Sequence, residues 1–233
     1  MHITITSFSL IAIYLSRVVS AHTVTISAPD PGPTPMPPVM GVLFVQTSDP
    51  TFSGYVAIAR DVLGRYVVTQ DRSLALPVTY ADHQIFPMFV EGFTNLGATF
   101  GEVFQSPPEG PGNNAFEGNS FNFAALTGTS SGIYGEPAQA GKTSYIPAPT
   151  NFYESAFFTL DHQNNEILPT WINPDGSPKP STFGISLDGG ELEDPPLFVS
   201  MNIGSFNAIY GGYSARIFLV NDPLPVNSIS ITD

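Results

Sequence analysis

Three histidines could supply nitrogen ligands to a metal ion if the chain is cut after Ala21. The cut makes His22 the first residue, so that its free α-amine and its imidazole can bind one metal together. His83 and His162 are the histidines that could add a third nitrogen. A set of three nitrogens suits copper. Our first interpretation is that His22 has no ligand role and that the protein has no cofactor, and copper binding is the alternative.

Four carboxylates around two glycines form a second candidate metal site. They are Asp188, Glu191, Glu193 and Asp194. Hard oxygen ligands in a loop suit calcium, although the spacing differs from that of an EF-hand loop. An acidic chain also produces such clusters as solvated turns. A solvated loop is therefore our first interpretation, and calcium binding is the alternative.

Aromatic side chains offer a third kind of site. Tyr134, Tyr145 and Tyr153 lie in or beside the long central connection of the chain. Exposed tyrosine rings could stack on sugar faces while their hydroxyl groups keep a partner or water. The alternative is that these rings point inward, as do the residues on one face of a strand. A lectin-like, carbohydrate-binding surface is thus one hypothesis.

Signatures of catalysis are weak. A glycosidase needs two carboxyl groups facing each other across a cleft, and strand parity alone does not pair the available glutamates, among them Glu91 and Glu154. No Gly-x-Ser-x-Gly motif is present. The chain also has no cysteine, which excludes thiol catalysis and thiolate metal sites. We therefore expect no catalytic activity, with a copper enzyme as the alternative.

The net charge limits the partners. Seven Lys and Arg face 20 Asp and Glu, which gives a formal charge of -13. Such a chain repels phosphate backbones, so a nucleic-acid partner is excluded. Anionic membrane surfaces are disfavoured for the same reason, and no membrane partner is expected after the signal is removed.

The first 39 residues are expected to lie outside the folded domain. Residues 3–15 are apolar, and Val19, Ser20 and Ala21 are the small residues that a signal peptidase reads, which predicts a signal peptide over 1–21 and secretion. The apolar run is shorter than a spanning helix needs. The alternative is an N-terminal strand. Residues 22–39 are rich in proline and should form an extended spacer.

Short apolar runs separated by turn residues continue from residue 40 to residue 221, and a tail over 222–233 follows. This pattern predicts one all-β domain, an antiparallel sandwich or barrel of about twelve short strands with long surface loops. The expected strands are 41–47, 54–59, 65–69, 74–79, 85–90, 98–104, 120–126, 155–160, 167–172, 182–187, 197–202 and 215–220.

Two segments carry a resemblance. Residues 154–161 (ESAFFTLD) and 171–177 (WINPDGS) are an apolar strand, an Asp-led turn, a strand ending in Trp and an Asn-x-Asp-Gly-Ser turn. This order resembles a group of secreted proteins of basidiomycete fungi, which are related more distantly to fungal cell-wall and surface proteins. The possible amine and imidazole pair of His22 resembles the histidine brace of the lytic polysaccharide monooxygenases, which are secreted β-sandwich copper enzymes.

These observations together predict a secreted structural or binding protein, extracellular or associated with a fungal cell wall, without catalytic activity. Its expected partners are cell-wall polysaccharide or other extracellular proteins. The alternatives are a polysaccharide-active copper enzyme that uses His22 and a lectin-like carbohydrate-binding module.

Overall fold

The computed structural model describes residues 37–100, 115–118, 120–146, 152–187 and 194–221. The chain divides into two units, residues 1–35 and 36–233, and every described residue lies in the second. The expected signal peptide, most of the proline-rich segment and the C-terminal tail lie outside the described residues.

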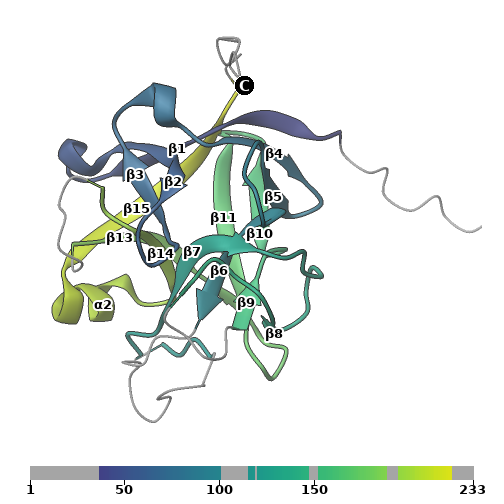
Figure 1. Cartoon of the computed structure of the whole chain (residues 1–233). Coiled ribbons are helices and arrows are strands. Elements are labelled where there is room, and N and C mark those ends of the chain that lie inside the picture. Colours follow the sequence, from purple (N-terminus) through teal and green to yellow (C-terminus); the bar gives the residue numbers. More distant parts are fainter. Residues whose placement is uncertain (1–36, 101–114, 119, 147–151, 188–193, 222–233) are drawn as a thin grey trace, which may run out of the picture. The chain divides into compact units, whose positions relative to one another are not determined.

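The all-β prediction is confirmed: an eight-stranded antiparallel barrel carries seven further strands outside it (Figure 1). Around the barrel the strands run in the order β1 (Val39–Thr47), β4 (Pro77–Ala81), β5 (Gln84–Pro87), β6 (Asn95–Phe100), β7 (Phe123–Thr129), β14 (Leu197–Ser200), β13 (Thr182–Ser186) and β15 (Gly212–Val220). The pairing of β1 with β15 closes the ring.

The seven other strands extend or cover the barrel. They are β2 (Gly54–Arg60), β3 (Tyr66–Thr69), β8 (Gln139–Ala140), β9 (Phe152–Glu154), β10 (Phe158–Asp161), β11 (Glu166–Ile172) and β12 (Pro178–Pro180). Short 3-10 turns lie at Pro50–Phe52 and Arg72–Leu74, and the α-helix α2 spans Ile203–Tyr210. No helix of the described ranges is long and apolar enough to span a membrane.

Alternating side chains fill the barrel. In β1, Leu43 and Val45 are buried in the core, and they stand opposite Leu219 and Ile217 of β15. Residues two apart on a strand share one face, so this register places four apolar side chains inside the ring. Trp171 is fully buried, and its ring contacts those of Phe100, Phe116 and Phe157.

The side chain of Asn173 binds the backbone of Phe116 next to Trp171. Its Oδ1 accepts a hydrogen bond from the Phe116 amide at 2.7 Å, and its Nδ2 donates to the Phe116 carbonyl at 3.0 Å. The ring of Phe116 stacks on Trp171 with 5.0 Å between ring centroids. One amide side chain thus replaces a pair of strand hydrogen bonds for the short described stretch 115–118.

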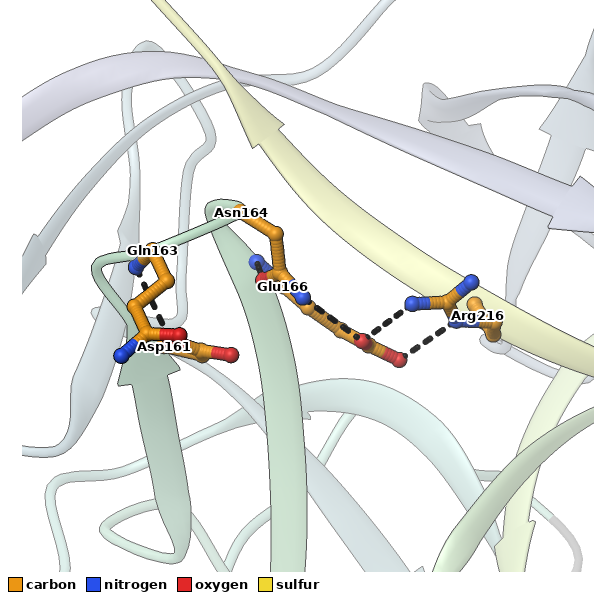
Figure 2. Close-up of polar contacts among 5 residues, drawn as sticks. All are labelled: Asp161, Gln163, Asn164, Glu166 and Arg216. Atoms are coloured by element: carbon orange, nitrogen blue, oxygen red, sulfur yellow. Dashed lines mark hydrogen bonds and ion pairs between the residues drawn. The ribbon is translucent and has the colours of Figure 1, made fainter.

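The hairpin loop after Asp161 forms as the sequence predicts (Figure 2). Asp161 Oδ1 accepts from the Gln163 amide, and Asn164 Oδ1 accepts from the Glu166 amide. Glu166 then meets Arg216 of β15 through two hydrogen bonds of 2.8 and 2.6 Å (Figure 2). Arg216 lowers the pKa of Glu166 below its ordinary value, mainly by hydrogen bonding.

Candidate functional site

The turn between β4 and β5 is strained. Asp82 and His83 both have positive φ, 48° and 63°, and they join the paired residues Ala81 and Gln84. A two-residue hairpin turn with both φ values positive usually contains Asn and Gly. A non-glycine residue in this region costs free energy and persists only where its surroundings hold it.

Two hydrogen bonds hold His83 in this conformation. Its carbonyl accepts from the Phe158 amide at 3.2 Å, and its Nδ1 lies 3.0 Å from the Phe158 carbonyl. A carbonyl oxygen only accepts hydrogen bonds, so His83 Nδ1 is the donor in this contact. The turn is therefore fixed to the start of β10.

The imidazole of His83 supports an exposed aromatic ring. Tyr134, from the connection between β7 and β8, stacks on it with 3.7 Å between ring centroids and 15° between the ring planes. Tyr134 remains 55% exposed. We call this pair the His83–Tyr134 platform.

A polar network joins the same two segments beside the platform. Gln84 Oε1 accepts hydrogen bonds from Asn95 Nδ2 at 2.7 Å and from Ser131 Oγ at 3.0 Å. Thr94 Oγ1 donates in turn to Asn95 Oδ1. Both contacts use the oxygen of Gln84, and neither uses its amide nitrogen.

Gly132 seats the segment that carries Tyr134. A Cβ atom at this position would lie 2.9 Å from Ser155 Oγ, which is closer than such atoms normally approach. Ser155 is fully buried. The glycine therefore allows residues 131–134 to lie close to the start of the Ser155–Phe158 stretch that also holds His83.

The structure thus brings together two residues that the sequence suggested for different chemistries. The sequence suggested His83 as a copper ligand and Tyr134 as a sugar-stacking residue. His162 lies elsewhere, in the exposed turn between β10 and β11, and His22 lies outside the described residues. Within the part of the chain that the structure describes, no three His, Cys, Asp or Glu residues are grouped to hold a metal.

The other predicted site residues are placed as follows. Tyr145 and Tyr153 are buried, at 3% and 4% exposure, so their rings are not offered to a ligand at the surface. Asp194 is exposed beside Pro195. Asp188, Glu191 and Glu193 of the acidic cluster lie outside the described residues.

Glu154 is a buried acid that the sequence did not distinguish from the other glutamates. It is 5% exposed in β9, and its Oε1 accepts a hydrogen bond of 2.8 Å from the Ile172 amide. Burial raises the pKa of Glu154 to about 9, although this hydrogen bond acts in the opposite direction. The side chain is therefore protonated at neutral pH. No described carboxylate contributes to this shift through its charge.

Sequence reasoning missed the two contacts that build the platform. Asp82-His83 lacks the Asn-Gly signal of a hairpin turn, and Phe158 lies 75 residues further along the chain. We compared the chain with protein-family models, with curated proteins and with solved structures, and none matched. The class that the fold and the site define is a closed antiparallel barrel that carries an exposed aromatic platform.

Proposed function

We propose that this chain is a secreted, non-catalytic binding protein that holds an extracellular polysaccharide on the His83–Tyr134 platform. The observation that carries the proposal is the exposed Tyr134 ring, backed at 3.7 Å by an imidazole that two hydrogen bonds fix to the barrel. A ring held in this way loses little conformational freedom when a flat ligand binds, which favours affinity.

The surroundings of the ring suit a sugar. One face of a pyranose is apolar and can cover an aromatic ring, while its hydroxyl groups need polar partners. The polar side chains of Gln84 and Ser131 lie in the network beside the platform. The net charge of -13 favours a neutral polymer over an anionic one.

The expected cellular setting completes the proposal. The apolar run over residues 3–15 supports secretion, and the resemblance of residues 154–161 and 171–177 supports a fungal cell-wall or extracellular location. A cell wall offers polysaccharide at high local density, where a modest affinity per site suffices.

Retention of the protein on insoluble chitin, β-glucan and cellulose tests this function. We expect the wild type to sediment with at least one polymer and Tyr134→Ala to bind it roughly tenfold more weakly, as for loss of an aromatic contact. Phe89→Ala is the matched control, because Phe89 is 78% exposed and lies in a different connection. If none of the polymers retains the wild type, or if both variants bind like it, the proposal is wrong.

A further inference from the structure

Arg60, the last residue of β2, lies against two aromatic rings. It stands opposite Tyr66 of β3, and its guanidinium carbon lies 5.9 Å from the Tyr66 ring centroid and 5.4 Å from that of Phe93. Guanidinium groups are attracted to aromatic faces at these distances. The cation is thus held between two rings.

Two polar atoms of this site are buried without a hydrogen-bond partner among the described residues. They are Arg60 Nη1 and Tyr66 Oη. A buried donor without a partner costs free energy, and a charged one costs more. Burial raises the pKa of Tyr66 to about 12, while the nearby charge of Arg60 lowers it. Tyr66 therefore keeps its proton at neutral pH and can donate it in a hydrogen bond.

Two other guanidinium groups of the described residues are paired with carboxylates. Arg65 pairs with Asp61 at 2.7 Å, and Arg216 pairs with Glu166 at 2.6 Å. The protein carries 20 acidic residues, yet no described carboxylate lies within ion-pair distance of Arg60. Arg60 Nη1 and Tyr66 Oη, which belong to directly paired residues, are thus two buried donors without an acceptor among the described residues.

We infer that Arg60 and Tyr66 form a binding site for a small carboxylate. A carboxylate has two oxygen atoms that only accept, so it can receive hydrogen bonds from the guanidinium and from the phenol together. Its negative charge also balances that of Arg60 inside the aromatic walls. This site shares no residue with the platform, and the inference stands whether or not the protein binds polysaccharide.

The connection between β5 and β6 forms one side of this site. Phe93 lies in this connection, which begins with a hydrogen bond from the Met88 amide to the Pro77 carbonyl. Phe89, in the same connection, is 78% exposed and has a φ of 62°. Gly128 forms the wall beside the cation, because a Cβ there would lie 2.7 Å from Arg60 Nη1.

Thermal unfolding of the full chain in sodium acetate, with sodium chloride at equal ionic strength as the reference, tests the inference. We expect a melting temperature that rises with acetate and reaches a plateau, as binding to the folded state requires. Arg60→Met should weaken acetate binding at least tenfold, because a charge-assisted hydrogen bond is lost. Arg216→Met removes the same charge at an exposed position and should respond like the wild type.

Tyr66→Phe provides the second variant, since it removes only the hydroxyl group and keeps the ring. We expect it to fold even if Arg60→Met does not, and to bind acetate several-fold more weakly than the wild type. Equal effects of acetate and chloride on the wild type would overturn the inference. An unchanged acetate response in Tyr66→Phe or Arg60→Met would do the same, because the site would then lie elsewhere.

Discussion

The buried acid Glu154 makes a quantitative prediction about pH and stability. Its pKa is about 9 in the folded chain, against an ordinary value of 4.5. Between these two values the folded protein keeps a proton that the unfolded chain releases. The folded state therefore binds more protons, and its contribution to the free energy of unfolding falls as pH rises from about 4.5 to about 9.

The magnitude follows from the linkage relation. Each pH unit in this range is worth about 1.4 kcal/mol, so keeping the proton at pH 7 costs the folded state about 3 kcal/mol relative to pH 4.5. Glu154→Gln has no proton to lose. Its side-chain oxygen can still accept from the Ile172 amide, so the contact of 2.8 Å in the wild type is conserved.

Urea unfolding of the wild type and of Glu154→Gln at pH 5, 6, 7 and 8 measures this effect. We expect the stability of the variant relative to the wild type to increase by about 1.4 kcal/mol for each pH unit. The change of this stability difference with pH is more informative than its value at any one pH. The second amide proton of glutamine adds a contribution to the difference that does not depend on pH. Groups that titrate alike in both proteins cancel in the difference.

Glu166→Gln is the matched control. The pKa of Glu166 is lowered by Arg216 from its ordinary value of 4.5, so its contribution is present above that value and is lost only at lower pH. The difference in free energy of unfolding between Glu166→Gln and the wild type should therefore stay constant between pH 5 and pH 8. Parallel curves for Glu154→Gln and the wild type would refute the reasoning, since they would mean that Glu154 is ionised in the fold.

Four further outcomes are expected. Trp171→Ala should lower the free energy of unfolding by about 3–5 kcal/mol in chemical denaturation, because it empties a fully buried site; a loss below about 1 kcal/mol would contradict its place in the core. His83→Ala should lower the free energy of unfolding by about 1–2 kcal/mol in the same assay, since it keeps the positive φ and removes the side-chain hydrogen bond to Phe158. An unchanged denaturation midpoint would mean that this hydrogen bond does not stabilise the turn. Arg216→Ala should leave the free energy of unfolding almost unchanged, as exposed ion pairs do, and a clear loss would show that this pair is not merely a surface contact. Gly132→Ala should weaken polysaccharide binding, because its Cβ would crowd Ser155 Oγ and displace the segment that carries Tyr134, although the Tyr134 side chain itself is unchanged. Wild-type affinity in this variant would contradict the role of Gly132 in placing that segment.

Much of the fold could be predicted because turn chemistry is local. Asn173-Pro174-Asp175-Gly176-Ser177 forms the expected turn, in which Gly176 takes a φ of 80° and donates to the Asn173 carbonyl. The strands β8, β9 and β12 were missed, since they have two or three residues and too short a hydrophobic pattern. The prolines of β12 also argue against a strand except at an edge.

Helix α2 was missed although its signals were present. Asn202 caps the helix by accepting from the Ser205 amide, and Gly211 ends it with a φ of 73°. Phe206 then packs against Phe123 and Phe198 of the neighbouring strands. A helix of eight residues with one buried side chain shows too little periodicity to be distinguished from a strand.

The platform could not be predicted from the sequence, because its contacts join distant segments. His83 adopts a conformation that its own neighbours disfavour, and the compensation comes from Phe158 and from the stacked Tyr134. The sequence alone identified Tyr134 only as one of three candidate stacking residues. Which of the three candidate tyrosines is exposed depends on packing across the whole barrel.

The central claim is that polysaccharide binds at Tyr134, and tyrosine ring resonances test it most directly. The full chain, labelled with carbon-13 in its tyrosine rings, would be titrated with oligosaccharides cut from the polymer that retains it, with Tyr134→Phe to assign the resonance. Our account predicts that the Tyr134 signal shifts with saturation, while those of the buried Tyr145 and Tyr153 stay in place. Saturable binding that leaves the Tyr134 signal unmoved would contradict it.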